Sequence, residues 1–129
     1  MDTILMQKPE KIPAIVMYNI MTGGNSKQMK SLTGRGVVTA NSIVLASTAG
    51  VDGDPHPYVV IEVDGAIHRT SSPSFIRGVQ AYFECFDPEV PFRFTVEVGR
   101  SASGREFITF NPVFEGGVVD AEKEVCDSH

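Results

Sequence analysis

The sequence predicts a mainly β protein, a five-stranded Greek-key barrel with one short α-helix between its third and fourth strands. Three observations favour this fold class. A β-rich run extends over residues 37–47, an Asp-Gly pair separates two alternating runs, and a helical pattern from residue 73 precedes an aromatic hairpin over residues 92–110. The order strand, hairpin, helix, hairpin is typical of a small barrel with a helix inserted between its strands.

Length and composition predict one folded domain in the cytoplasm. The 129 residues fit a single domain, and 42% of them are apolar. No run approaches the roughly 18 apolar residues that a membrane span requires, and no charged segment followed by an apolar block opens the chain. We therefore expect no membrane partner, and an arm over residues 1–12, a domain over 13–114 and a tail over 115–129.

The first part of the chain predicts extended structure followed by a short helix. Residues 1–12 are polar, contain Pro9 and lack a clear period, so we treat them as an arm. Residues 14–21 are apolar on both alternating faces, which predicts a strand or an extended segment laid against the barrel. Residues 26–32 suit one or two turns of helix, which Gly34 ends.

The longest predicted strand covers residues 37–47. It is apolar on both alternating faces, as expected for a long, coiled barrel strand that serves both ends of a closed sheet. The loop that follows, over residues 48–57, is rich in Gly, Asp and Pro.

Asp64-Gly65 predicts a two-residue type I′ hairpin between residues 58–63 and 66–70. One face of this hairpin is mostly apolar and should belong to the core. The other face carries Tyr58 and Arg69 and need not be buried. The predicted cross-strand pairs on the core face are Val63 with Ala66, Ile61 with His68, and Val59 with Thr70.

A helix of about 14 residues is predicted after this hairpin. Ser72 is typical of an N-cap and Pro73 of the first helical position, while Asp87-Pro88 stops the helix. Its apolar stripe suits a plug packed on the bottom of the barrel. The residues of the stripe are Phe75, Val79, Tyr82, Phe83 and Phe86.

The final hairpin turns over residues 99–104 and directs its aromatic face inward. Its alternation predicts that Ile108 and Phe110 point into the core and that Phe107 points outward beside Arg105. A nucleobase can stack on such an exposed ring. Alternatively, the N-terminal arm or a second subunit covers Phe107, so a homo-oligomer also fits the pattern.

The negative charge of the chain is concentrated in its last residues. The formal net charge is −5, of which residues 115–129 contribute −4. The remaining 114 residues carry ten Lys and Arg against eleven Asp and Glu, so the body of the protein is nearly neutral. We expect the acidic tail to be disordered. It either competes for a basic groove and recruits replication proteins, or serves only solubility.

The element order matches that of an oligonucleotide/oligosaccharide-binding (OB) barrel, whose ligand face is formed by its second and third strands and the flanking loops. Several short motifs also resemble small single-stranded-DNA-binding proteins of phages of Gram-positive bacteria, including phages with protein-primed replication. The resemblance implies a non-catalytic replication protein that coats and protects single-stranded DNA in the host cytoplasm without strong sequence preference. The motifs are Tyr18-Asn19, Ser31-Leu32-Thr33-Gly34, Asp64-Gly65, Ser71 to Phe75, and Ser103-Gly104-Arg105, within residues 13–112.

The candidate nucleic-acid-binding residues are cations and aromatic rings on predicted exposed faces. The cations would contact phosphates, and the rings would stack on bases. The cations are Lys27, Lys30, Arg35, Arg69, Arg93, Arg100 and Arg105, and the rings are those of Tyr18, Tyr58 and Phe107.

Patterns for catalysis, metal binding or a cofactor are absent from the sequence. The two cysteines and three histidines have no metal-ligand spacing. No nucleophile elbow or zinc-protease motif occurs, and the Gly-rich segment near residue 24 does not match a phosphate-binding loop. We therefore expect neither an enzyme nor a cofactor. The alternative function is a structural or protein-interaction β-barrel, such as a virion component, that binds no nucleic acid.

Overall fold

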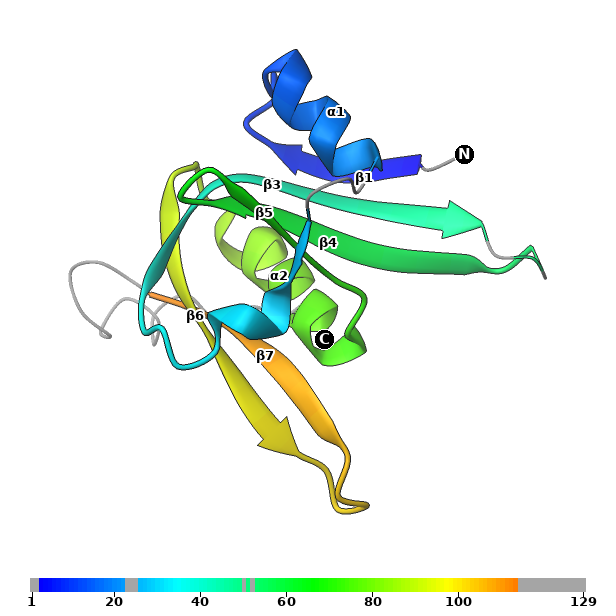
Figure 1. Ribbon diagram of the computed structural model, residues 1–129, viewed down its shortest axis with the longest axis vertical. Coiled ribbons are helices and arrows are strands. Elements are labelled where there is room, and N and C mark those ends of the chain that lie inside the picture. Colours follow the sequence, from blue (N-terminus) through cyan, green and yellow to red (C-terminus); the bar gives the residue numbers. More distant parts are fainter. Residues whose placement is uncertain (1–2, 23–25, 50, 52, 114–129) are drawn as a thin grey trace.

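A curled sheet forms the body of the protein, and helices pack on both of its faces (Figure 1). The computed structural model describes residues 3–22, 26–49, 51 and 53–113. The elements are β1 (Thr3–Lys8), α1 (Ala14–Thr22), β2 (Lys27–Gln28), the 3-10 helix η1 (Met29–Leu32), β3 (Val38–Ala49), β4 (Pro55–Val63), β5 (Ala66–Thr70), α2 (Pro73–Phe86), β6 (Phe92–Arg100) and β7 (Glu106–Pro112).

The sheet is organised around β3, its longest strand. Along one edge β3 pairs with β4, and its other edge is shared, because β6 pairs with residues 38–40 and β1 with residues 43–47. The strand order is β2-β5-β4-β3-β6-β7, with β1 joined to β3. The mainly β fold with a curled sheet is thus confirmed. The described residues form seven strands, where five were predicted.

Both faces of β3 are apolar because a core cluster lies on each side of the sheet, and a β-bulge changes which residues face inward. The pairing of β3 with β4 shifts register between Ala40 and Ser42, so Asn41 is an extra residue on β3. Before the bulge the even-numbered residues of β3 face the main core, and after it the odd-numbered residues do. As a result Ala40 and Ile43 belong to the same core cluster, while Val44 faces the other side of the sheet.

The β4–β5 hairpin confirms the predicted turn and its register. Asp64 and Gly65 have φ angles of 53° and 80°, as a type I′ turn requires. The pairs Val63 with Ala66, Ile61 with His68, and Val59 with Thr70 all form.

Helix α2 also confirms its prediction, with 14 residues that begin at Pro73 and end before Asp87. The Ser72 side chain does not cap the helix with a hydrogen bond. The aromatic face of α2 packs inside the curled sheet, where the rings of Phe75 and Phe110 meet edge to face with centroids 5.5 Å apart. This face therefore belongs to the main core, as expected for a plug.

Helix α1 replaces the strand that was predicted over residues 14–21. It covers the outer face of β3, β4 and β5, where Ile20 is 1% exposed within a second core cluster. Tyr58 is a member of this cluster and is 2% exposed. The prediction that this face could stay open to solvent is therefore wrong for Tyr58, whereas Arg69 on the same face is partly exposed.

The segment before α1 adds a strand to the sheet. β1 pairs antiparallel with β3, and Lys8 Nζ lies 3.1 Å from Asp87 Oδ1 at the end of α2. The hydrogen bond to Asp87 raises the pKa of Lys8. Part of the predicted arm is thus joined to the sheet. The predicted acidic tail over residues 115–129 lies outside the described residues.

Within the described part of the chain, neither α-helix has the length and apolar character that crossing a bilayer would require.

Candidate nucleic-acid interface

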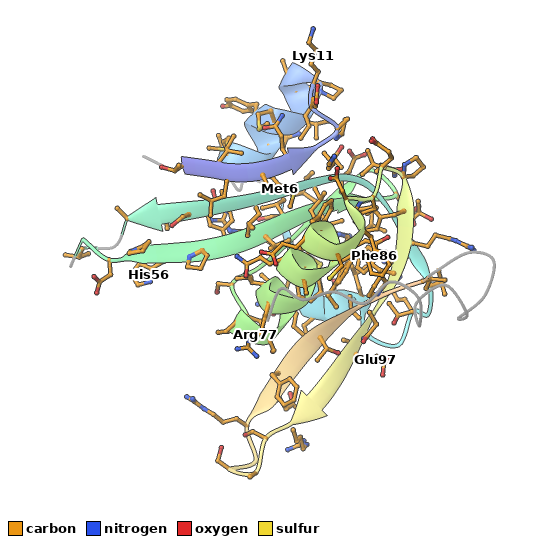
Figure 2. The ribbon with its side chains drawn as sticks, turned by 180° about the vertical axis from the view of Figure 1, so that it is seen from behind. Met6, Lys11, His56, Arg77, Phe86 and Glu97 are labelled. Atoms are coloured by element: carbon orange, nitrogen blue, oxygen red, sulfur yellow. The ribbon has the colours of Figure 1, made fainter. Side chains whose placement is uncertain are left out.

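A groove of about 1230 Å³ lies between two projecting hairpins. Thr48 and His56, near the far end of the β3–β4 ladder, line one side, and Val98 and Arg105 on the β6–β7 hairpin line the other. The two hairpins diverge in space, with η1 and α2 between them (Figure 1). Figure 2 shows Arg77 on α2 in this region, between His56 on β4 and the β6–β7 hairpin.

The groove concentrates positive charge in an acidic protein. Five of the eleven Lys and Arg residues of the chain line it, against a single acidic residue, Glu106, among the described lining residues. Four of the five cations form no ion pair within the described part of the chain, so their charges are available to an anion. The five are Lys27, Lys30, Arg69, Arg77 and Arg105, and only Lys30 among them forms an ion pair in the described structure.

Arg69 is held by an aromatic ring rather than by a carboxylate. Its Cζ lies 3.8 Å from the centroid of the Tyr58 ring, a cation–π contact that comes from their positions on neighbouring strands. The ring itself is buried between the guanidinium and the second core. Tyr58 therefore positions Arg69 at the groove and offers little surface of its own to a base.

The far end of the Phe107 ring lies over Gly99 on the paired strand. It faces Gly99 in the β6–β7 register, and a Cβ added to Gly99 would lie only 2.6 Å from Cζ of Phe107. The absence of a side chain at Gly99 thus makes room for the ring. Phe107 is half-buried and is among the residues that line the groove. Val98, which is 42% exposed, also lines the groove, but it pairs with Ile108 and so points to the other face of the hairpin.

Glu106 on β7 links η1 to β6 through two hydrogen bonds. Its Oε1 accepts a hydrogen bond of 2.7 Å from Lys30 Nζ on η1, and its Oε2 accepts one of 3.0 Å from Arg100 Nη2 on β6. The hydrogen bond and the charge of Lys30, with a smaller effect of Arg100, hold the pKa of Glu106 below its usual range. The carboxylate is therefore ionised near neutral pH.

The beginning of α2 contributes hydroxyls and a cation. Ser74 Oγ donates to the Ile108 carbonyl at 2.9 Å and lies 3.2 Å from Ser72 Oγ, which connects the first turn of α2 to β7. Arg77 is exposed one turn further on. Its side chain lies outside the buried apolar stripe of α2, to which Ile76 and Val79 belong.

The groove brings together six of the ten predicted binding residues: Lys27, Lys30, Tyr58, Arg69, Arg105 and Phe107.

The other four lie elsewhere. Tyr18 is on α1 and is 64% exposed, on the opposite layer of the protein. Arg35 lies 3.8 Å from Asp64, Arg93 lines a separate hollow of about 440 Å³ beside Tyr82, and Arg100 pairs with Glu106 next to the groove.

Sequence reasoning missed Arg77 and the serines at the start of α2. The helix was interpreted only as a plug, although its polar face follows directly after Arg69 and Thr70 in the chain. A helix that begins beside a basic strand presents its first turns to the same surface, and that signal was available in the sequence.

Two further findings bear on chemistry. No group of three or more His, Cys, Asp or Glu side chains suited to a metal ion occurs among the described residues. His68 is 1% exposed on β5, its Nδ1 lies 3.2 Å from the Ala66 carbonyl oxygen, and its Nε2 has no hydrogen-bond partner in the described structure. Burial lowers the pKa of His68.

None of the family models, curated proteins or solved structures with which the chain was compared matches it.

Proposed function

We propose that the protein binds and protects single-stranded DNA, without strong sequence preference, in the groove between the β3–β4 and β6–β7 hairpins. The observation that carries this proposal is the segregation of charge. An acidic chain gathers five cations in one groove against one carboxylate among the described lining residues. Polyanion binding depends on such local cations, because the phosphate backbone dominates affinity.

The arrangement of strands supports an OB interpretation of the fold. If β3, β4, β5, β6 and β7 are the five barrel strands, α2 falls between the third and fourth strands. The groove then lies between the loops that join strands one to two and four to five, beside strands two and three. OB barrels bind oligonucleotides on this surface. In this interpretation β1 and β2 are additions to the barrel.

The aromatic ring among the lining residues favours a single strand over a duplex. The ring of Phe107 offers a surface on which an unpaired base can stack, which is worth roughly 1–3 kcal/mol per base. A duplex keeps its bases stacked inside the helix and would use only the cations. Because every base has a π-face, stacking of this kind tolerates any sequence.

The proposed biological setting is phage DNA replication in the cytoplasm of the host, as the resemblance of the short motifs implies. The protein would act without catalysis and without a cofactor. The acidic segment over residues 115–129 would then compete for the groove or recruit replication proteins.

Titration of a labelled oligothymidylate and of a duplex of equal length tests the proposal. We expect the protein to bind the single strand more tightly and to lose affinity as salt rises. With as many as five phosphates neutralised, the log–log slope should approach about −3.5, from about −0.7 for each phosphate of a single strand. Failure to bind the single strand at low salt, or equal affinity for the duplex, would contradict the proposal.

A protein-interaction β-barrel is the second candidate function. It is favoured by apolar side chains exposed on the layer opposite the groove, where Leu5 is 55%, Ile15 68% and Tyr18 64% exposed. A protein that fails to bind oligonucleotides but self-associates, with loss of self-association in Ile15→Ser, would support this function instead.

A further inference from the structure

Glu106 occupies an unusual place in the groove, as its only acidic residue among the described lining residues. Each of its carboxylate oxygens is bound by a different cation. Lys30 approaches from η1 at 2.7 Å and Arg100 from β6 at 3.0 Å. The two cations belong to elements that are far apart in the sequence, and this one carboxylate links them.

A phosphodiester in the place of the Glu106 carboxylate would make the same two contacts, one with Lys30 and one with Arg100. A phosphodiester also presents two charged oxygens, which Lys and Arg side chains bind by charge-assisted hydrogen bonds. The ion pairs that Glu106 forms are open to solvent, since the side chains of Lys30, Arg100 and Glu106 are 54%, 68% and 41% exposed. Ion pairs that face water contribute little to stability, so an incoming anion can replace the carboxylate at small cost.

We propose that the Glu106 carboxylate holds a phosphate position of the groove, and that one phosphodiester of the bound strand takes Lys30 and Arg100 from it. This inference rests on the proposed binding of single-stranded DNA. It adds Arg100 to the binding site, although Arg100 does not line the groove while it is paired with Glu106. It also makes Glu106 an internal competitor that lowers affinity for every phosphate ligand.

The test compares two substitutions with the same change of charge in the same hairpin. Glu106→Gln removes the competitor. Glu97→Gln is the matched control, because Glu97 forms no ion pair within the described residues and is not among the residues that line the groove. Binding is measured by fluorescence anisotropy of a labelled oligothymidylate, and urea unfolding verifies that each variant is folded.

We expect Glu106→Gln to tighten binding about two- to fivefold, the range that exposed ion pairs span, and Glu97→Gln to change it much less. Lys30→Gln breaks the same ion pair from the other side and should weaken binding. The opposite signs separate competition from a loss of structure, which would weaken binding in both variants.

Each result decides the inference. Equal tightening by Glu106→Gln and Glu97→Gln would assign the effect to net charge and overturn it. Unchanged or weaker binding by Glu106→Gln, with the wild type still binding, would also overturn it while leaving the proposed function intact. A wild type that does not bind the oligonucleotide at all would overturn the proposed function itself.

Discussion

Gly99 and Phe107 form a pair in which the smaller residue positions the larger. The ring lies where a Cβ on Gly99 would be, and it is the far end of the Phe107 side chain that would be displaced. A methyl group at Gly99 can therefore move the ring without moving the backbone. Because Gly99 has no positive φ, an alanine there adds no backbone strain.

We predict that Gly99→Ala weakens binding of an oligothymidylate by up to about tenfold, since a displaced ring loses part of its stacking, which is worth roughly 1–3 kcal/mol per base. The free energy of unfolding should change little. Phe107→Leu supplies the control, because once the ring is gone Gly99→Ala should have no further effect on affinity. Additive losses in the double variant would contradict the pairing.

His68 makes folding depend on pH. Burial lowers its pKa in the folded protein, so the unfolded chain takes up a proton more readily. The stabilisation is complete above the unfolded value of about 6.5 and decreases as pH falls below it, towards the folded pKa. Lys27 and Arg35 add to the lowering, while Asp64 and the Ala66 carbonyl oppose it.

We predict that the free energy of unfolding of the wild type decreases between pH 7 and pH 5 and that His68→Leu reduces this dependence. The measurement is urea unfolding at a series of pH values. A slope that persists unchanged in His68→Leu would assign the dependence to other groups.

At the scale of elements, α1 shows where sequence patterns fail. Residues 14–21 are apolar at nearly every position, and a short run of this kind suits a strand as well as a helix. Tertiary contact decides between them. Val16, Met17, Ile20 and Met21 pack on the outer face of the sheet, at the spacing of one helical side, while Ile15 remains exposed.

Two isoleucines of α1 provide a direct test of this packing. Ile20 is 1% exposed, so we predict that Ile20→Ala costs about 2–5 kcal/mol of stability through lost burial and a cavity. Ile15 is 68% exposed, and Ile15→Ala should change stability by no more than about 0.5 kcal/mol. Urea unfolding measures both. Equal costs would contradict the orientation of α1.

The elements with strong local signals were predictable. Asp64-Gly65 determines its turn through the positive φ angles that these residues tolerate, and Pro73 marks the first position of α2. The bulge in β3 was not predictable, because the change in which residues face inward depends on pairing with β4 rather than on local sequence. β1 was missed for a similar reason, since its sequence has no alternation of polar and apolar residues and pairing with β3 defines it.

At the scale of the whole molecule, the candidate site is assembled from segments that are distant in the sequence. Lys30 and Glu106 are 76 positions apart, and only the fold brings them together. The alternation of strands predicted that Phe107 and Arg105 face outward. It could not predict which cations share a groove, and for that reason Tyr18, Arg35 and Arg93 were grouped with residues from which the fold separates them.

The salt dependence of binding in two variants tests most directly that this groove holds single-stranded DNA. Arg77→Gln removes a cation from the groove, and Lys11→Gln removes one from the far end of the protein (Figure 2). For an oligothymidylate, we predict that Arg77→Gln reduces the magnitude of the log–log slope by about 0.7 and that Lys11→Gln leaves it unchanged. An unchanged slope in Arg77→Gln, or an equal reduction in both variants, would contradict the account.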